Sequence, residues 1–292
     1  MKAIYETLGI SKQAFHQFLN REMLQMEEEQ QLLPLIDRVR SDHPRMGARE
    51  IYSLIQPQTM GRDQFIDFCY RHGYKLEVKH SAHRTTDSRG VIKFDNLLAG
   101  TSIELTGVNQ LWVSDITYYR LGERFYYLTF ITDLYSRRIV GWKGSQTLMT
   151  KDTTLPALNF ALNHRSIEEG LILHSDGGGQ YYCKQFVELT REYGIQNSMG
   201  EKAYENPHAE RVNGIIKNDY LIPYGPQNFR ELCGFLNKAV EMYNYQRPHN
   251  SLYGWAPAGF EANFPHSPQF STKRKKEAKK EKPNDDSNGL MI

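Results

Sequence analysis

The sequence predicts an α/β protein whose main domain is a mixed five-stranded sheet in the order βββαβαβα, preceded by an all-α region. Three observations lead to this fold class. Residues 2–74 show helical spacing of apolar side chains, residues 110–142 show strand-like runs joined by short turns, and residues 153–217 alternate helical with strand-like segments. With 292 residues and 39% hydrophobic content, the chain can bury the core of one domain of about 150 residues beside smaller modules.

Composition excludes several classes of protein. The net charge of +2 does not by itself indicate a nucleic-acid binder. The chain has three widely separated cysteines, Cys69, Cys183 and Cys233, and no CxxC pair. The sequence therefore supports neither a disulfide framework nor a Cys-rich zinc site. No apolar run approaches the roughly 18 residues of a membrane-spanning helix, and the first residues lack a signal-peptide core. We therefore expect an intracellular protein that does not enter a membrane.

Residues 1–22 are predicted to form a helix-turn-helix. Lys2–Leu8 is followed by a turn at Gly9, and Ser11 is a suitable N-cap for a second helix that ends at Asn20. The polar side chains of this second helix are able to reach phosphates or base edges: Lys12, Gln13, His16 and Gln17. An ordinary helical hairpin without DNA contact fits the same residues.

Two further segments precede the sheet. Residues 23–74 are predicted to be a second helical, helix-turn-helix-like DNA-binding region with helices at 23–40, 48–55 and 61–72. Residues 75–105 are predicted to be a basic linker that lies on DNA or on the next domain, with Arg84 and Arg89 as DNA contacts. A solvated linker without such contacts is the alternative.

Residues 106–262 are predicted to form the sheet domain with a C-terminal helix. Short turns predict that its first three strands form an antiparallel meander. The expected strands are 111–119, 125–132, 138–142, 171–174 and 196–199, and the expected helices are 153–162, 180–193, 206–217 and 229–243. This order is the pattern of a ribonuclease-H-like domain. Residues 263–292, with seven basic residues between Lys273 and Lys282, are predicted to be a disordered basic tail that binds phosphates weakly.

Three carboxylates occupy positions that suit a metal site. Asp115 lies within the first strand, where an Asp is costly unless it is paired or bound to a metal. Asp176 ends a strand and precedes three glycines, at a place where open α/β sheets bind ligands. Glu210 lies on a helix on which Asn213 and Lys217 follow at i+3 and i+7, so the three share one face. Each carboxylate alone fits a turn cap or a salt bridge equally well.

Together the three carboxylates repel one another and need a cation. Hard oxygen ligands select Mg²⁺ or Mn²⁺. Two such ions about 3.5–4 Å apart would activate an attacking oxygen and stabilise the leaving oxygen in a phosphoryl displacement. Asp133, in Thr-Asp-Leu-Tyr-Ser-Arg, better fits the cap of a turn.

Five motifs, in order, resemble those of one family. They are Ser-Asp-Ile-Thr-Tyr (114–118), Asp-Leu-Tyr-Ser-Arg-Arg-Ile-Val-Gly-Trp (133–142), His-Ser-Asp-Gly-Gly-Gly-Gln-Tyr (174–181), Glu-Arg-Val-Asn-Gly-Ile-Ile-Lys (210–217) and Tyr-Asn-Tyr-Gln-Arg-Pro-His-Asn-Ser-Leu (243–252). Over about residues 1–262 the chain resembles the OrfB-type transposases of the IS-three family of bacterial insertion sequences, which are relatives of retroviral integrases. The resemblance implies a DDE catalytic triad at Asp115, Asp176 and Glu210. It also implies that Lys217 contacts the transposon end.

The chain departs from the family in one respect. The interval between Asp176 and Glu210 is two residues shorter than is usual, and a trim in the loop 200–206 would absorb the difference. Glu205 is the rival third carboxylate, although it precedes the Pro and lacks a Lys seven residues later. His174 and His208 are expected to pack in or beside the site, or to orient water or phosphate. We expect three further side chains to touch DNA: Asn213, Arg247 and His249. The alternative for the Arg247-Pro-His249 segment is that it only ends the last helix.

The resemblance further implies a reaction and partners. The protein would bind double-stranded DNA at the element ends and at the target, and would cut and join strands with Mg²⁺ or Mn²⁺, two ions being expected. A homodimer or a higher synaptic oligomer is expected, as is an upstream OrfA product fused to this chain or bound by it. The expected place is the bacterial cytoplasm, at the nucleoid. A non-catalytic DNA-binding relic or regulator of the same element, and a structure-selective nuclease, are the alternatives.

Overall fold

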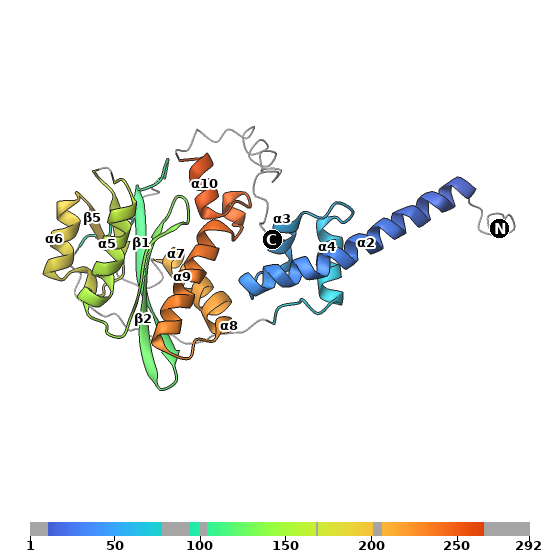
Figure 1. Cartoon of the computed structure of the whole chain (residues 1–292). Helices are drawn as coiled ribbons and strands as arrows, with labels where there is room; N and C mark the ends of the chain where they lie inside the picture. The colour runs from blue at the N-terminus through green and yellow to red at the C-terminus, as the bar shows by residue number, and fades with distance from the viewer. Residues whose placement is uncertain (1–10, 78–93, 100–103, 168, 201–205, 266–292) are drawn as a thin grey trace. The chain divides into compact units, whose positions relative to one another are not determined.

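The computed structural model describes residues 11–77, 94–99, 104–167, 169–200 and 206–265 of the chain. The chain divides into two compact units, Met1–His80 and Ser81–Ile292 (Figure 1). None of the helices in the described ranges is long and apolar enough to cross a membrane.

The first unit is helical. It contains α2 (Lys12–Asp42), α3 (Ala48–Ile55) and α4 (Arg62–Arg71). Its core lies where the second half of α2 meets α3 and α4, because the apolar residues of each helix recur on one face. The core includes Leu32, Ile36, Met46, Ile51, Phe65, Phe68 and Cys69.

Helix α2 differs from the sequence prediction. Ser11 caps it as expected, since the Ser11 hydroxyl accepts a hydrogen bond from the Ala14 N–H at 3.1 Å. The predicted end at Asn20 and new start at residue 23 are wrong, because α2 is one continuous helix of 31 residues. Neither Gly nor Pro follows Asn20 at once, and an interior Asn costs a helix only about half a kcal/mol, so nothing stops the helix there. The first helix of the predicted helix-turn-helix, residues 2–8, lies outside the described residues.

The second unit contains the predicted mixed sheet. Its strands are β1 (Leu111–Leu121), β2 (Arg124–Asp133), β3 (Ile139–Ser145), β4 (Ile172–Ser175) and β5 (Gln196–Met199). They are ordered β3-β2-β1-β4-β5. β1, β2 and β3 pair antiparallel, as the short turns predict, whereas β4 pairs parallel with β1 and with β5. This arrangement confirms the predicted ribonuclease-H-like fold class.

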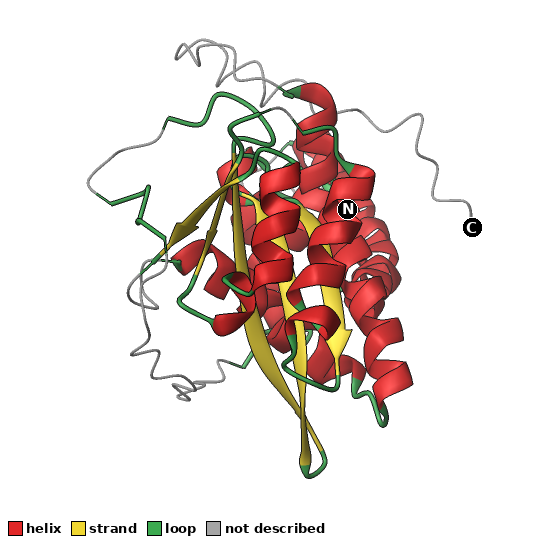
Figure 2. Cartoon of the chain, turned by 90° about the vertical axis from the view of Figure 1, so that its left-hand side faces the viewer, coloured by secondary structure: helices red, strands yellow, loops and turns green. Residues whose placement is uncertain are grey.

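Helices cover both faces of this sheet (Figures 1 and 2). α5 (Thr154–His164) and α6 (Lys184–Glu192) contribute to one apolar cluster, which includes Trp112 and Ile131 of the sheet. At Gly141 of β3 the approach to α5 is so close that a Cβ would lie 2.3 Å from the Ala157 carbonyl oxygen. Short 3₁₀ turns occur at Thr150–Asp152, Gly179–Tyr181 and Asn250–Leu252.

The opposite face is covered by the C-terminal helices. α7 (Pro207–Gly214) continues into a π-helix (Ile215–Leu221) and α8 (Ile222–Tyr224), and α9 (Phe229–Tyr245) packs beside them. α10 (Pro257–Asn263) ends the described chain. The predicted α-helix at 206–217 is thus correct only as far as Gly214. Beyond it the turn widens, and such π segments are rare and occur frequently at functional sites.

Part of the predicted basic linker contacts the sheet unit. The Met199 N–H donates to the Asp95 carbonyl at 3.4 Å, and the Leu97 N–H donates to the Ser198 hydroxyl at 3.0 Å, so residues 94–99 lie beside β5. Arg84 and Arg89 lie outside the described residues, as does the predicted tail beyond residue 265.

Candidate active site

Two aspartates meet because β1 and β4 are parallel neighbours. The strands pair Leu111 with Ile172 and Val113 with His174. Continuing this register by two residues places Asp176, just past the end of β4, beside Asp115 of β1, and the charge of Asp176 acts on Asp115. Residues 61 apart in sequence become neighbours in this way, which no local pattern encodes.

Asp115 is held by two hydrogen bonds. Its Oδ1 accepts from the Ile116 N–H at 2.9 Å, and its Oδ2 accepts from the Asn213 amide at 2.7 Å. Burial raises the pKa of Asp115 to about 7, and the charges of Asp176 and Glu210 add to this rise, while the two hydrogen bonds oppose it. The site therefore has an excess of negative charge when all its carboxylates are ionised.

Asp176 begins the turn after β4. Its Oδ1 accepts from the Gly178 N–H at 3.1 Å. Burial raises the pKa of Asp176, and this backbone hydrogen bond opposes the rise. A Cβ on Gly178 would lie 3.0 Å from the Asp176 Oδ1, so a larger residue at this position would crowd the Asp176 carboxylate.

Helix α7 presents Glu210 near the pair. Asn206, just before the helix, donates from its amide to the Ser114 carbonyl at 2.9 Å and anchors the helix to β1. Pro207 occupies the first turn, as predicted. Glu210 is exposed, and its charge reaches Asp115. In the described residues no three His, Cys, Asp or Glu side chains are placed to hold one metal ion.

The helix and β1 contact each other through three successive pairs. Asn213 donates to Asp115, the Lys217 ammonium donates to the Thr117 hydroxyl at 3.3 Å, and the Tyr119 hydroxyl donates to the Leu221 carbonyl at 3.3 Å. Every second residue of the strand thus meets every fourth residue of the helix. Burial lowers the pKa of Lys217, and the Asp115 charge opposes this. Lys217 is the cation that the structure places beside Asp115.

The donor set fits a hard divalent cation. Asp115 and Asp176 offer carboxylate oxygens. Burial, and then the charges of Asp176 and Glu210, raise the pKa of Asp115, and a cation would offset those charges. Asp115, Asp176 and the nearby Glu210 are the residues that would hold the metal. Neither a thiolate nor an imidazole is required.

The remaining predicted DNA contacts occupy different surroundings. Lys12, Gln13, His16 and Gln17 are exposed on α2. Asn213 is buried and binds Asp115. Arg247 is only 6% exposed and pairs with Asp219 at 2.9 Å, with its guanidinium over the Tyr220 ring. This location favours the alternative in which Arg247 closes the end of α9.

His249 fits the same structural reading. The His249 ring meets the Tyr243 ring edge-on with centroids 4.9 Å apart, and the His249 backbone N–H donates to the Trp255 carbonyl at 3.0 Å. Burial, together with the charges of Arg247, Arg211 and Arg137, lowers the pKa of His249 to about 3. A neutral, packed imidazole offers little attraction for a phosphate.

The other titratable residues of the motifs are also placed. Asp133 caps its turn as predicted, since its Oδ1 accepts from the N–H groups of Tyr135 and Ser136. The His174 Nδ1 lies 2.9 Å from the Ser198 hydroxyl in the core. His208 is hydrogen-bonded to Arg137 at 3.0 Å, and burial and nearby arginines lower its pKa. Glu205 lies outside the described residues.

Sequence reasoning missed three residues of this site. Asn206 and Thr117 were not singled out, and Asn213 was assigned to DNA rather than to Asp115. The alternation of Asp115, Thr117 and Tyr119 along one strand was the available signal, because these side chains share a face. What faces them depends on the helix packed above.

Comparisons with known proteins bear on the family of the chain. The chain matches the Integrase core domain family over residues 106–204, and a second family description of the same name over residues 192–257. It is 28% identical to the insertion element IS600 uncharacterized 31 kDa protein of Shigella sonnei, over 89% of this chain and 97% of that protein. It is 36% identical to transposase InsF for insertion sequence IS3A of Escherichia coli, over 63% of this chain and 62% of that protein. The chain therefore matches less than two thirds of the length of that transposase.

Several solved structures are similar to part of this chain, and one of them is described here. It is the HTLV-2 integrase catalytic core domain in complex with magnesium, in a dimeric form, with 23% identity, a TM-score of 0.43, and coverage of 54% of this chain and 98% of that chain. Because the TM-score lies below 0.5, the family of the chain is inferred from the sequence matches, and its fold class from the sheet topology.

Proposed function

Since this chain belongs to the integrase-core transposases of the IS-three family, we propose that it binds the ends of a mobile DNA element and catalyses metal-dependent strand cleavage and strand transfer. One observation carries the proposal. Asp176 follows β4, the parallel neighbour of β1 on which Asp115 lies, and burial and the charge of Asp176 raise the pKa of Asp115. Such perturbed carboxylates are typical of functional sites.

Asp115, Asp176 and Glu210 would hold Mg²⁺ or Mn²⁺. When bound, the metal supplies activation of an attacking oxygen and stabilisation of the leaving oxygen. Asn213 fixes the Asp115 carboxylate through the 2.7 Å hydrogen bond, so that the other carboxylate oxygen keeps its orientation. Lys217, beside Asp115, would offset the negative charge of the DNA phosphate.

The proposed reaction has two displacements. In the first, a water oxygen bonds to the phosphorus at an element end, and the element's 3′-oxygen leaves and takes a proton. In the second, this 3′-hydroxyl attacks a target phosphodiester, and a new 3′-hydroxyl leaves. No covalent bond to the protein forms in either step.

The proposed DNA contacts fall on each of the two units separately. Gln13 and Gln17 on α2, and Lys217 beside the site, are exposed or half-buried groups that suit phosphate contact. Arg84 and Arg89 remain proposed contacts outside the described ranges. We assign Arg247 and His249 to packing instead. Bound partners would be double-stranded element ends and target DNA, held by more than one copy of the chain.

The test uses duplex DNA from the sequence that flanks this gene, with Mg²⁺ or Mn²⁺. Wild type is expected to nick the end and to produce strand-joined DNA on a denaturing gel. Asp115→Asn and Asp176→Asn are expected to lose both products while retaining end binding in fluorescence anisotropy. Glu192→Gln, which alters an exposed carboxylate on α6, is the matched control and should keep both activities.

Each other outcome has a defined meaning. Nicked DNA without joined DNA would support the nuclease alternative and overturn strand transfer. Binding by wild type without nicking in either metal would support the non-catalytic regulator. Full activity of Asp115→Asn would remove Asp115 from the reaction.

A further inference from the structure

Two arginines beside the candidate active site have no carboxylate partner. Arg137 lies in the turn between β2 and β3, and Arg211 follows Glu210 on α7. In the part of the chain that the structure describes, neither of them forms an ion pair, whereas Arg138 and Arg247 each do. Both guanidinium groups are therefore open to an anion from outside the chain.

The turn after β2 fixes the position of Arg137. Its backbone has a φ of 64°, in the left-handed region that residues with a side chain seldom adopt. The Arg137 N–H donates to the Asp133 carbonyl at 2.8 Å, and the Asp133 N–H donates to the Arg138 carbonyl at 2.9 Å. Strained conformations persist only where the surrounding structure holds them, and they cluster at functional sites. The turn thus directs the Arg137 side chain at a cost in backbone strain.

The Arg137 side chain reaches α7. Its guanidinium donates to the His208 Nδ1 at 3.0 Å, and within the described ranges it makes no other hydrogen bond. None of its other nitrogens is buried without a partner, so those nitrogens contact solvent. Burial lowers the pKa of Arg137, and the Arg211 charge adds to this lowering, against two acidic neighbours. A half-buried cation with one open side is a group that a bound anion would stabilise.

Helix α7 carries these basic groups on a different face from Glu210. His208 and Arg211 are three residues apart, so they are neighbours on one face, and both are exposed. Glu210 lies about 160° around the helix from His208. Burial, and then arginine charges that include those of Arg211 and Arg137, lower the pKa of His249. Arg137, His208 and Arg211 therefore converge on one surface.

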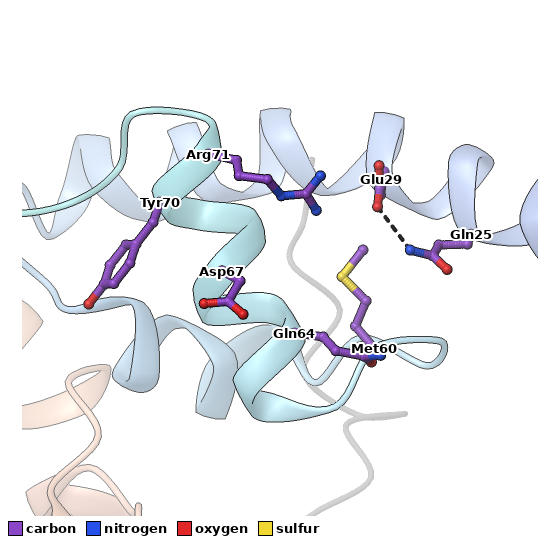
Figure 3. A pocket seen from close by; sticks show the side chains of 7 residues that line it. All are labelled: Gln25, Glu29, Met60, Gln64, Asp67, Tyr70 and Arg71. Atoms are coloured by element: carbon purple, nitrogen blue, oxygen red, sulfur yellow. Dashed lines mark hydrogen bonds between the residues drawn. The ribbon is translucent and has the colours of Figure 1, made fainter.

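A cavity in the first unit has a different balance of charge. Its volume is about 720 Å³, and Glu29, Asp67 and Arg71 are among the side chains that line it (Figure 3). One arginine there accompanies two carboxylates, so the cavity has no excess of positive charge that would select an anion. The surface that Arg137 and Arg211 share has such an excess, because no carboxylate in the described residues pairs with either of them.

We propose that Arg137, His208 and Arg211 form an oxyanion site that binds a backbone phosphate of DNA beside the phosphate that reacts. This inference rests on the proposed function for the identity of its ligand. A guanidinium binds phosphate oxygens through paired N–H groups. Because the His208 Nδ1 accepts from Arg137, the His208 Nε2 carries the proton and donates to the same anion. With Lys217 on the other face, α7 contacts the DNA backbone on both sides of Glu210.

Inorganic phosphate tests the site in the full chain without DNA or metal. Phosphate at about ten times its dissociation constant is expected to raise the Tm of wild type by roughly 3–5 °C over sodium chloride of equal ionic strength. Arg137→Ala and Arg211→Ala are each expected to lose this rise. Arg191→Ala removes an equal charge from an exposed position on α6, across the sheet, and this matched control should keep the rise. Arg211 is exposed, so Arg211→Ala tests the site even where Arg137→Ala fails to fold.

Duplex DNA tests the identity of the ligand. In fluorescence anisotropy without metal, Arg137→Ala and Arg211→Ala are each expected to weaken binding about tenfold and to reduce the slope of log affinity against log salt by about one. The loss should be equal for the element-end duplex and for an unrelated duplex, because phosphate contacts carry no sequence information. Arg191→Ala should bind both duplexes as wild type does.

Each result supports or overturns the site. A phosphate effect that both arginine variants lose, together with weaker binding of both duplexes, supports it. Absence of a phosphate effect in wild type, or an effect that both variants retain, overturns it. A lost phosphate effect with unchanged DNA binding would assign the site to a free oxyanion and overturn the DNA contact. Because neither measurement uses metal or cleavage, failure of the proposed reaction is distinguishable from failure of this site.

Discussion

We expect Asp115→Asn to stabilise the metal-free protein, and we expect the same change to abolish cleavage. Burial, and then the charges of Asp176 and Glu210, raise the pKa of Asp115 from an ordinary 3.8 to about 7. An ionised Asp115 is therefore a cost to the folded state in the absence of a cation. An uncharged amide of the same shape removes that cost, and it can donate to the Asn213 Oδ1, which is buried and accepts no hydrogen bond within the described residues.

The magnitude follows from linkage between protonation and folding. The gap between 3.8 and about 7 is roughly three pH units, and each is equivalent to about 1.4 kcal/mol, or on the order of 4 kcal/mol in all. Because Asp115 is partly exposed, water screens some of this cost, and about 2 kcal/mol is the expected effect. The folded state binds the proton more tightly than the unfolded state. The stability that protonated Asp115 contributes to the folded state is therefore complete below pH 3.8 and is lost as the pH rises through about 7.

The assay is denaturant unfolding of both proteins in a chelator at pH 4, 6 and 8. The difference in unfolding free energy, variant minus wild type, should grow from near zero at pH 4 to about 2 kcal/mol at pH 8, which corresponds to roughly 4–8 °C in Tm. Added Mn²⁺ should stabilise wild type and have a smaller effect on the variant. A destabilising effect at pH 8, or an equal gain from the exposed-site control Glu192→Gln, would refute the reasoning.

Two further predictions concern the helix over β1 and the C-terminal helix. Asn213→Ala should slow cleavage by about 10- to 100-fold with end binding unchanged, because it frees the Asp115 carboxylate to rotate. Lys217→Ala should instead weaken the binding of element ends and reduce the salt dependence of that binding by about one unit of slope. Identical cleavage rates and binding affinities for the two variants would contradict these separate roles. Glu261→Ala should destabilise the protein by about 3–5 kcal/mol in urea unfolding, because it leaves the guanidinium groups of Arg138 and Arg165, 2.6 and 2.7 Å from the Glu261 carboxylate, without that carboxylate in the interior. A loss below about 1 kcal/mol would show that water replaces the carboxylate.

The sequence by itself determined the local elements of this protein. Alternating apolar residues and short turns predicted the antiparallel strands, and helical spacing predicted α3 and α9, because these signals depend only on residues close in the chain. The role of Asp133 was readable for the same reason, since an Asp caps its own turn. The order of the motifs identified the family.

Only the tertiary structure decided how these elements meet. The parallel pairing of β1 with β4 brings Asp176, just past β4, close to Asp115, and the helix above β1 pairs Asn213 with Asp115. The widening to a π-helix after Gly214 and the burial of Arg247 were likewise invisible in the sequence. Each depends on residues that are distant in the chain, whose pairing follows from packing of the whole core and from no local period.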